Sequence, residues 1–250
     1  MSSAQRSNWF QSGGQDYARY RPLYPPQLAH YLAQVAPDAD CAVDVGCGSG
    51  QLTTLLADHF HTVIGVDPSA AQLASAIADP RVQYLVAPAE ALPLADARAS
   101  LVCAAQAAHW FNLPAFHAQV RRIAQPGAVV ALISYGVMVI DGPADAVFQH
   151  FYQHGVGPWW PAERALVDQG YAGLDFPYAE FGAPAMRIQA QWSLADVLGY
   201  VGTWSAVRRA REAGQDALLE HFADRLTGVW GEPAQSRAVH WPINMRIGRV

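Results

Sequence analysis

The sequence contains no lysine, and all sixteen of its basic residues are arginine. This absence excludes a lysine Schiff base, and with it an ordinary pyridoxal-phosphate enzyme. It also excludes the phosphate-binding lysine of P-loop proteins and protein kinases. The net charge of −5 leaves no basic stripe for a phosphate backbone, so nucleic acid is not an expected partner.

Long apolar runs and cysteines are also scarce. Apolar stretches such as Ala128–Ile133 are far shorter than the roughly 20 residues of a membrane helix. Residues 1–15 contain no apolar run typical of a signal peptide. The three cysteines, Cys41, Cys47 and Cys103, include no CxxC pair and cannot form a disulfide framework. We therefore expect a cytoplasmic protein from a reduced compartment, with no membrane partner.

The first half of the chain shows a regular succession of short strands and helices. Strands are predicted at 41–45, 62–66, 82–86, 101–105 and 128–133. Helix starts are predicted at Ser49, Ser69 and Asn112. In the last of these helices, Phe116, Val120 and Ile123 would form the buried face. Buried strands that alternate with helices indicate a parallel, doubly wound α/β sheet.

The second half of the chain loses this regularity. Residues 143–176 have a helical and strongly aromatic pattern, and further helices are predicted near 193–212 and 215–230. Met186–Trp192 alternates like a strand, and residues 236–250 alternate again, which predicts an antiparallel closing strand at or near a sheet edge. A chain of 250 residues suits one sizeable domain that buries roughly 70–75% of its unfolded surface. We therefore expect a helical cap after the fifth strand.

Ligands of doubly wound sheets bind at the carboxyl ends of the strands, where the strand order reverses. The first predicted strand leads there into Gly46, Gly48 and Gly50, with Asp44 just before them. Glycines at every second position allow a tight turn and let a ligand approach the backbone without meeting a Cβ. The next helix would present its N-terminal N–H groups to the same space.

Asp67 follows the second predicted strand, 21 residues beyond Gly46. A carboxylate at this place can accept hydrogen bonds from both hydroxyls of a ribose. Taken alone, Asp67 could instead be an acid at a helix N-terminus before Pro68. Combined with the glycine loop, it predicts a ligand that contains a nucleoside.

The spacing of the glycines separates two kinds of nucleoside cofactor. A dinucleotide fingerprint reads Gly-x-Gly-x-x-Gly, whereas the third glycine of this chain, Gly50, comes one residue early. Together with Asp44, the loop resembles motif I of class I S-adenosylmethionine-dependent methyltransferases. Residues 89–94 (AEALPL) are similar to that family's segment beneath the adenine, and 104–111 (AAQAAHWF) lie where its fourth strand opens onto the methyl group. This resemblance covers about residues 40–135.

A narrower resemblance extends over nearly the whole chain. Residues 17–25 (YARYRPLYP) resemble the first segment of methyltransferase type 11 proteins, a group that includes trans-aconitate and cantharidin-type carboxyl methyltransferases. Residues 109–111 (HWF) and 203–205 (TWS) also resemble this group. Two positions depart from the family pattern, because Pro88 and Ser100 stand where acids are frequent. Without an aspartate at position 88, the adenine amino group would be held by backbone or by Glu90.

The resemblance implies a set of residues around S-adenosylmethionine and its product S-adenosylhomocysteine. Contacts with the cofactor are expected from Tyr17, Arg21, Asp44, Gly46, Cys47, Gly48, Gly50, Gln51, Asp67, Pro68, Ala89, Glu90 and Gln106. Contacts with the methyl acceptor are expected from Tyr20, Tyr24, Trp110, Trp159, Trp160 and Trp204. The N-terminal tyrosines would fold over the cofactor as a lid. Arg21 would clamp a carboxylate of the cofactor or of the acceptor, or would only cap a helix or lie on the surface.

His109 is the candidate catalytic residue, because it lies just after the fourth predicted strand. A phenol, hydroxyl or amine acceptor needs a general base, whereas a carboxylate is already ionised near pH 7. His109 is thus either that base or a histidine that lines the pocket beside Trp110. His150 and His154 stand four residues apart, but no HExxH pattern and no third ligand accompany them, so no metal is expected.

We therefore predict an S-adenosylmethionine-dependent methyltransferase that acts on a small molecule, with a carboxylate as a candidate acceptor, as a monomer or homodimer. The expected fold is a mostly parallel, Rossmann-like sheet of seven strands with a helical cap. Within a single domain, residues 1–40 would form the lid and first helix, 41–135 the cofactor-binding core, 136–235 the cap and a late strand, and 236–250 the closing strand. The alternatives are a non-catalytic S-adenosylmethionine-binding module and an NAD-dependent oxidoreductase.

Overall fold

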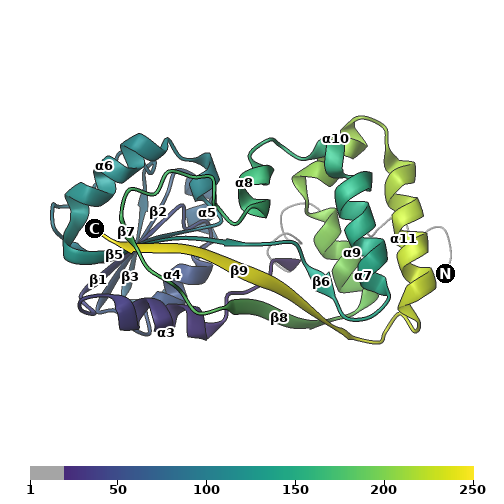
Figure 1. Ribbon diagram of the computed structural model, residues 1–250, viewed down its shortest axis with the longest axis horizontal. Coiled ribbons are helices and arrows are strands. Elements are labelled where there is room, and N and C mark those ends of the chain that lie inside the picture. Colours follow the sequence, from purple (N-terminus) through teal and green to yellow (C-terminus); the bar gives the residue numbers. More distant parts are fainter. Residues whose placement is uncertain (1–19) are drawn as a thin grey trace. The chain divides into compact units, whose positions relative to one another are not determined.

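The computed structural model describes residues 20–250, and the chain divides into two compact units (Figure 1). One of them, which we call the sheet unit, consists of Leu23–Gly136, Ala165–Arg187 and Pro242–Val250. The other, the helical unit, consists of Val137–Arg164 and Ile188–Trp241 together with the described residues up to Pro22. Each unit is thus assembled from segments that lie far apart in the sequence.

Five parallel strands form the centre of the sheet unit, in the order β3-β2-β1-β4-β5. Their bounds are β1 Cys41–Val45, β2 Thr62–Asp67, β3 Val82–Val86, β4 Ala99–Ala105 and β5 Ala124–Tyr135. The strand β9 (Arg237–Arg249) runs antiparallel beside β5, with Val129 opposite Arg249 and Tyr135 opposite Ile243. The prediction of a mostly parallel, doubly wound sheet with an antiparallel closing strand is confirmed.

The described residues contain two strands, of two residues each, that the sequence pattern does not predict. β6 (Val139–Ile140) pairs with the start of β9 in the helical unit, and β7 (Ala179–Glu180) pairs with its end in the sheet unit. The predicted strand β8 (Met186–Trp192) also pairs with β9. Segments as short as β6 and β7 cannot show an alternating pattern, so periodicity misses them.

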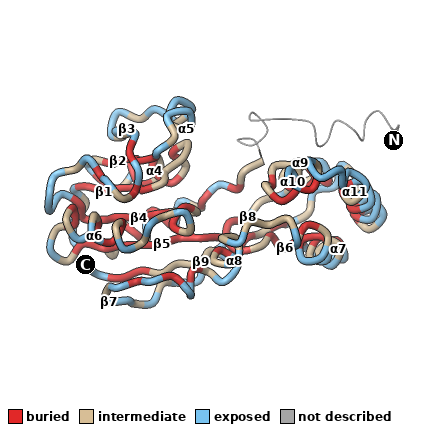
Figure 2. Tube along the Cα trace, turned by 90° about the horizontal axis from the view of Figure 1, so that it is seen from above, coloured by how far each residue is buried: buried red, intermediate tan, exposed pale blue. Residues whose placement is uncertain are grey.

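Burial explains which strands the sequence shows most clearly. β1 is buried at all five positions, as expected for a central strand that is covered on both faces. β3 lies at the edge of the sheet and has no fully buried residue, and Val86 at its end is 61% exposed. Figure 2 shows that the residues of β1, β4 and β5 are mostly buried and that those of α5 are largely exposed. The core of the sheet unit is therefore centred on β1, β4 and β5.

Helices cover both faces of this sheet. α3 (Pro26–Val35) and α4 (Gln51–Leu56) lie on one side in Figure 1, and α6 (Leu113–Ile123) lies on the other. The predicted cap Asn112 accepts a hydrogen bond from the Ala115 N–H at the start of α6. The inner face of α6 is formed by the predicted residues Phe116, Val120 and Ile123, each of which is fully buried.

The starts of two other helices show how local chemistry sets their bounds. Ser69 caps α5 (Ala70–Ala74) as predicted, since its side chain accepts a hydrogen bond from the Gln72 N–H. The prediction that Ser49 caps α4 is wrong, because Gly50 holds the cap position with a φ of +81°. Glycine adopts this left-handed conformation without strain, and serine does not.

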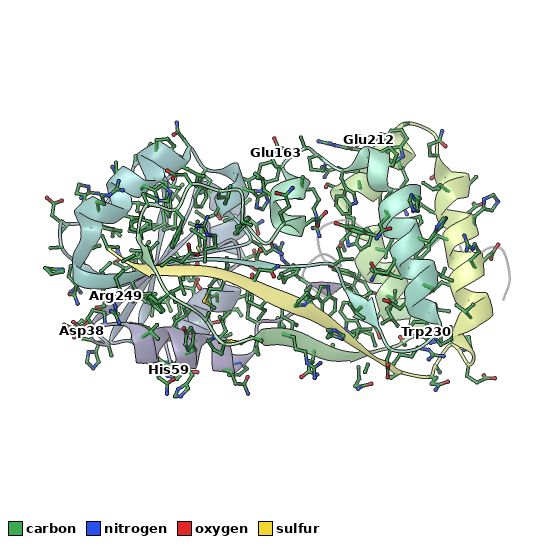
Figure 3. The ribbon with its side chains drawn as sticks, in the orientation of Figure 1. Asp38, His59, Glu163, Glu212, Trp230 and Arg249 are labelled. Atoms are coloured by element: carbon green, nitrogen blue, oxygen red, sulfur yellow. The ribbon has the colours of Figure 1, made fainter. Side chains whose placement is uncertain are left out.

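The helical unit consists of short helices joined by aromatic contacts. They are α7 Ala144–His150, a π-helix Phe151–Gly155, a 3-10 turn Gly157–Trp159, α9 Leu194–Gly202, α10 Ser205–Glu212 and α11 Asp216–Trp230. Ser193 and Asp196 form a capping box at the start of α9. Trp230 lies at the end of α11 (Figure 3), where its buried indole donates a hydrogen bond to the Gln235 carbonyl at 3.0 Å. Over residues 20–250, no helix has the length and apolar character that crossing a membrane requires.

Two helical predictions need correction. The helix expected over 193–212 is interrupted at Trp204, whose indole is buried in an aromatic cluster with Tyr152 and Trp160, at ring-centroid distances of 5.6 and 5.3 Å. Helix was also expected throughout residues 143–176, but the last helix in this region is α8 (Arg164–Asp168). Beyond that helix, Gly170 and Tyr171 take φ values of +61° and +65° and turn the chain away from helical geometry.

His117 connects the segment 165–187 to α6 within the sheet unit. Its side chain is buried, with Nδ1 2.8 Å from the Tyr178 hydroxyl and Nε2 3.1 Å from the Asp175 carbonyl oxygen. Burial lowers the pKa of His117, and the charge of Arg121 acts in the same direction. The fold therefore favours the neutral imidazole.

We expect the free energy of unfolding to decrease as the pH falls below about 6.5, the ordinary pKa of histidine. The folded-state pKa of His117 is lowered, so its stabilising contribution is complete above the unfolded pKa and is lost as the pH falls through the folded pKa. Urea unfolding of the protein and of His117→Gln at several values between about pH 5 and 8 measures this contribution. A difference between the two proteins that stays constant over this range would contradict the prediction.

Candidate active site

The loop after β1 takes backbone conformations that residues other than glycine rarely adopt. Gly46, Gly48 and Gly50 have φ values of +72°, +56° and +81°. A Cβ at Gly46 would overlap the Cβ of Ala107, and one at Gly50 would overlap the Tyr84 hydroxyl. A Cβ at Gly48 would meet nothing within 4 Å. The two outer glycines thus allow close packing, and the middle one borders open space where a ligand can approach the backbone.

Hydrogen bonds connect this glycine loop to the end of β2. The N–H groups of Gly46 and Cys47 donate to the Val66 carbonyl at 2.7 and 3.1 Å. The Gly48 N–H donates to Oδ2 of Asp67 at 2.9 Å. The loop and the acid that the sequence singles out therefore lie in one site, at the carboxyl ends of β1 and β2.

Asp67 also takes part in starting the next helix. Its Oδ1 accepts a hydrogen bond from the N–H of Ser69, the cap of α5, at 2.8 Å. The two interpretations of this acid from the sequence are therefore compatible. Pro68 lies between these two residues and borders the same strand end.

Asp44 lies beneath the glycine loop. It is 1% exposed, and its carboxylate accepts hydrogen bonds from the Thr53 hydroxyl at 2.7 Å and from the Cys103 thiol at 3.7 Å. Burial raises the pKa of Asp44 to about 6. The carboxylate thus joins β1 to α4 and β4, and Thr53 is a site residue that the sequence motifs do not reveal.

Cys47 and Gln51 lie within and just after the loop. Burial raises the pKa of the Cys47 thiol, and the carboxylates of Asp44 and Asp67 add to the effect. The thiol therefore stays protonated near neutral pH and does not act as a nucleophile. Gln51 is the first residue of α4, so its contact with a cofactor remains a prediction.

The segment after β4 packs against the glycine loop. Gln106 has a φ of +54°, its N–H donates to the Ile133 carbonyl at 2.8 Å, and its side-chain Nε2 donates to the Tyr135 carbonyl at 3.2 Å. Left-handed conformations of non-glycine residues cost free energy and often occur at functional sites. Ala107, the next residue, is the one that a side chain at Gly46 would overlap. The loops after β1 and β4 are therefore neighbours, as the prediction requires.

His109 lies two residues after Ala107, in the 3-10 turn Ala108–Trp110. Its Nδ1 is 2.8 Å from the hydroxyl oxygen of Tyr171, which is fully buried. Trp110, by contrast, is 62% exposed. Sequence reasoning identifies His109 but not Tyr171, because the two residues are 62 positions apart and no motif connects them.

Glu90 holds the segment that is predicted to lie beneath a nucleobase. Its Oε1 accepts a hydrogen bond from the Asn112 N–H at 2.7 Å, so it links this segment to the start of α6. Ala89 is buried beside it. One carboxylate oxygen of Glu90 is therefore already engaged. The backbone of residues 89–94 remains the other predicted partner for the adenine amino group.

The residues predicted to contact the acceptor are divided between the two units. Tyr24 belongs to the sheet unit, where its buried ring packs edge-on against Tyr135 at 6.1 Å. In the helical unit, the ring centroids of Trp160 and Trp204 are 5.3 Å apart. Among residues 20–250, the buried Nε1 of Trp160 has no hydrogen-bond partner.

Three further predicted residues, Tyr20, Arg21 and Trp159, belong to the helical unit. A side chain at Gly199 would overlap the ring of Tyr20, so these two residues are in close contact. Arg21 is partly exposed. The carbonyl of Trp159 accepts a hydrogen bond from Arg209 at 3.5 Å. Tyr17 lies outside the described residues, and its role as a cofactor contact stays a prediction.

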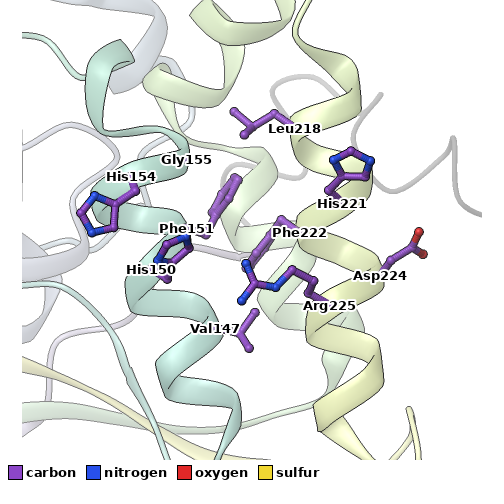
Figure 4. Close-up of a pocket in the computed structure, with 10 residues that line it drawn as sticks. All are labelled: Val147, His150, Phe151, His154, Gly155, Leu218, His221, Phe222, Asp224 and Arg225. Carbon is purple, nitrogen blue, oxygen red and sulfur yellow. The ribbon is translucent and has the colours of Figure 1, made fainter.

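A surface hollow of about 510 Å³ lies between α7 with its π-helix and α11 in the helical unit (Figure 4). Phe151 and Phe222 stack within it at 3.9 Å. The rings of His150 and His154 are 4.9 Å apart at its edge, and Figure 4 shows Arg225 extending from α11 toward α7. In the part of the chain that the structure describes, no group of three His, Cys, Asp or Glu side chains is placed to hold a metal ion.

Comparison with known proteins identifies the class to which this fold and site belong. Residues 43–132 match a family model described as a methyltransferase domain. A protein of Dictyostelium discoideum named as a methyltransferase is 31% identical, over 87% of this chain and 84% of its own. A solved structure from Anaeromyxobacter dehalogenans, described as a type II methyltransferase, is 45% identical with a TM-score of 0.87 and covers 92% of this chain and 97% of the other. The protein is therefore a methyl-transferring enzyme with a Rossmann-like fold.

The chain belongs to the class I S-adenosylmethionine-dependent methyltransferases. The family predicted from the glycine loop and its neighbouring motifs is thus confirmed. A more limited similarity is to a malonyl-(acyl-carrier protein) O-methyltransferase of Pseudescherichia vulneris, which is 32% identical over 49% of this chain and 50% of its own. The resemblance to the trans-aconitate methyltransferase-like group remains a prediction.

Proposed function

We propose that this enzyme binds S-adenosylmethionine in the sheet unit and transfers the methyl group to a small carboxylic acid. The observation that carries the cofactor assignment is the hydrogen bond from the Gly48 N–H to the Asp67 carboxylate. It joins the glycine loop to the acid at the strand ends where doubly wound sheets bind nucleosides. The crowding at Gly46 and the open space at Gly48 fit a cofactor that lies against the backbone.

Each part of this site would hold the cofactor in its own way. Asp67 would accept the ribose hydroxyls while it keeps the Gly48 N–H in place, and Asp44 would act from beneath by fixing Thr53. Pro68 and Ala89 would line the nucleobase. When bound, S-adenosylmethionine supplies an electrophilic methyl group, whose transfer to a carboxylate oxygen forms a C–O bond, breaks the C–S bond, leaves its electron pair on sulfur and releases no proton.

A carboxylate is supported as the acceptor by sequence resemblance and by its own chemistry. The narrower resemblance is to a group that includes carboxyl methyltransferases, and the malonyl group in the name of one relative ends in a carboxylate. Arg21 would supply a guanidinium that can bind a carboxylate with two parallel hydrogen bonds. A carboxylate also needs no general base near pH 7.

The sequence alone also left open a protein that binds S-adenosylmethionine without using it, and the membership of this chain in a methyltransferase family favours the enzyme. The glycine loop and Asp67 would be the same in both cases, so the two functions differ only in the acceptor pocket. The glycine spacing disfavours the third possibility, an NAD-dependent oxidoreductase.

Calorimetric titration of the purified protein with S-adenosylhomocysteine, and separately with NAD, tests this function. We expect micromolar affinity for S-adenosylhomocysteine and no measurable affinity for NAD. A methyl-transfer assay with trans-aconitate and a panel of other di- and tricarboxylates then follows. Preferential binding of NAD would contradict the cofactor assignment. Binding of S-adenosylhomocysteine without transfer to any carboxylate would contradict the acceptor class and favour a different acceptor or the binding module.

A further inference from the structure

The segment that joins β3 to β4, residues 87–97, begins beside the predicted ribose acid. Val86 pairs with Asp67 across β3 and β2, and the Ala87 N–H donates to the Asp67 carbonyl at 3.2 Å. Val86 is 61% exposed, and Pro88 is exposed as well. Ligand sites are lined mostly by apolar groups, with a few polar groups between them. A nucleobase attached to a ribose at Asp67 can cover this apolar surface, so residues 87–97, which we call the β3–β4 segment, are the part of the chain that would contact the base.

Arg122, near the end of α6, binds the backbone of the β3–β4 segment. Its guanidinium donates hydrogen bonds to the Leu94 carbonyl at 2.6 Å and to the Leu92 carbonyl at 2.7 Å. The Ala97 N–H donates in turn to the Arg122 carbonyl at 3.0 Å. Arg122 also forms an ion pair with Asp96 at 2.8 Å, but the side chain of Asp96 is 77% exposed, and exposed ion pairs contribute little to stability. The hydrogen bonds to the backbone are therefore the contacts that fix the segment.

Two further residues strengthen this connection. Gln119, one turn before Arg122 on α6, accepts hydrogen bonds through its Oε1 from Arg122 at 2.7 Å and from the Leu92 N–H at 3.3 Å. The cap residue Asn112 donates its N–H to Glu90 at 2.7 Å. All of these residues lie in the sheet unit. The helix α6 and its cap therefore hold the β3–β4 segment over most of its length.

The β3–β4 segment has few side chains that could recognise the amino group of an adenine. Pro88 has neither a side-chain acceptor nor a backbone N–H. The two carboxylates of the segment, Glu90 and Asp96, are engaged with Asn112 and Arg122. Recognition would then come from backbone carbonyl groups and from the second oxygen of Glu90, whose positions depend on the conformation of the segment. Binding groups must be held within about 0.5 Å of their productive positions, so this conformation decides the selectivity.

We propose that Arg122 is a positioning residue for the nucleobase of S-adenosylmethionine. By bridging the Leu92 and Leu94 carbonyls, it keeps the β3–β4 segment in the conformation that recognises the adenine amino group, and it acts through the segment without contacting the cofactor. The guanidinium suits this role because its planar fork of N–H groups binds two acceptors at once, whereas a lysine ammonium is a single point of charge. This inference rests on the proposed function and deepens it, since it assigns the selectivity for the base to a residue on α6.

Calorimetric titrations with S-adenosylhomocysteine and with S-inosylhomocysteine, in which oxygen replaces the adenine amino group, test this role. We expect the unmodified protein to bind S-adenosylhomocysteine at least about tenfold more tightly, as for the loss of a hydrogen bond. Arg122→Met should weaken the binding of S-adenosylhomocysteine by about tenfold and reduce the preference to less than about threefold, and Arg122→Lys should lie between. A general loss of stability would change both affinities alike. A preference that is unchanged in Arg122→Met, or absent from the unmodified protein, would overturn the inference.

Two further variants complete this test. Arg249→Met is a matched control, because it removes another guanidinium that donates to a backbone carbonyl, that of Gly127 at 3.2 Å, near the start of β5 and away from the strand ends. It should leave both affinities within about twofold. Gln119→Ala removes the acceptor that Arg122 and the Leu92 N–H share, and it should reduce the preference in the same direction as Arg122→Met. If thermal unfolding shows that Arg122→Met does not fold, an unchanged preference in Gln119→Ala contradicts the proposal.

Amide hydrogen exchange of the protein without any ligand measures how Arg122 orders the β3–β4 segment. We expect Arg122→Met to accelerate exchange in residues 90–97 by at least about tenfold and to leave residues 46–50 of the glycine loop within about twofold, because opening is local when the lost contacts are local. Equal exchange over residues 90–97 in the variant and the unmodified protein would contradict the positioning role. The same acceleration in both segments would show a general loss of stability and would contradict it too.

The affinity of the unmodified protein for S-adenosylhomocysteine separates this inference from the proposed function. If the unmodified protein does not bind S-adenosylhomocysteine, the proposed function fails, and the inference fails with it. If it binds, and Arg122→Met leaves both the exchange of residues 90–97 and the preference for adenine unchanged, only the role of Arg122 is wrong.

Discussion

Replacing Asp67 with alanine is expected to weaken the binding of S-adenosylhomocysteine by about a hundredfold. Two charge-assisted hydrogen bonds to the ribose would be lost, at a cost of about 3 kcal/mol, and each 1.4 kcal/mol corresponds to about a tenfold change in Kd. The variant also loses the hydrogen bond between Asp67 and the Gly48 N–H. The weaker binding therefore reflects both the lost ribose contacts and a less ordered glycine loop. Isothermal titration calorimetry measures the change.

Two further variants show whether this loss is specific. Asp58→Ala removes an exposed acid near the end of α4 whose partner Arg81 also pairs with Asp79, so we expect a Kd within twofold of the original. Asp67→Asn keeps the size of the side chain and one acceptor oxygen and should bind with intermediate affinity. Thermal unfolding of each variant checks that the fold is intact. An unchanged Kd in a folded Asp67→Ala protein would refute the assignment of this carboxylate to the ribose.

Gly46→Ala is expected to destabilise the protein by about 2–5 kcal/mol. An L-residue at a φ of +72° costs about 1–2 kcal/mol, and overpacking costs about 1–3 kcal/mol more. The new Cβ would overlap the Cβ of Ala107, and neither atom can move away by changing a rotamer, so the loops after β1 and β4 must separate. The melting temperature should fall by roughly 2–4 °C for each kcal/mol lost, which calorimetry measures. Binding of S-adenosylhomocysteine should be lost as well.

Alanine substitutions at two other glycines distinguish the effect of backbone strain from the effects of crowding and of lost ligand contact. Gly127 has a similar φ of +78° and a Cβ there would meet nothing within 4 Å, so Gly127→Ala should cost only the conformational part and leave binding unchanged. Gly48→Ala has the same open surroundings but lies in the loop, and it should combine a small loss of stability with at least a tenfold loss of affinity. Equal destabilisation by Gly46→Ala and Gly127→Ala would show that the contact with Ala107 is unimportant.

The central strands, the buried face of α6 and the position of the glycine loop could all be predicted from the sequence. β1 is apolar except for Asp44, and residues 128–133 of β5 form a continuous apolar run, because both faces of a central parallel strand are buried. The helix α6 shows its inner face because helical periodicity places its apolar residues on one side. Gly46, Gly48 and Gly50 could be recognised because glycine adopts left-handed conformations without strain, so glycines at this spacing indicate a tight loop.

The residues that support this loop could be identified only from the three-dimensional packing. Asp44 has its partners in Thr53 and Cys103, and His109 has its partner 62 positions away in Tyr171. Such pairs have no period and no fixed spacing, since they form where the fold brings separate segments together. The interruption of the predicted helix at Trp204 has the same origin, because burial of its indole among other aromatic rings outweighs local helix propensity. Periodicity reports which residues are buried, whereas the identity of their partners depends on how the segments pack.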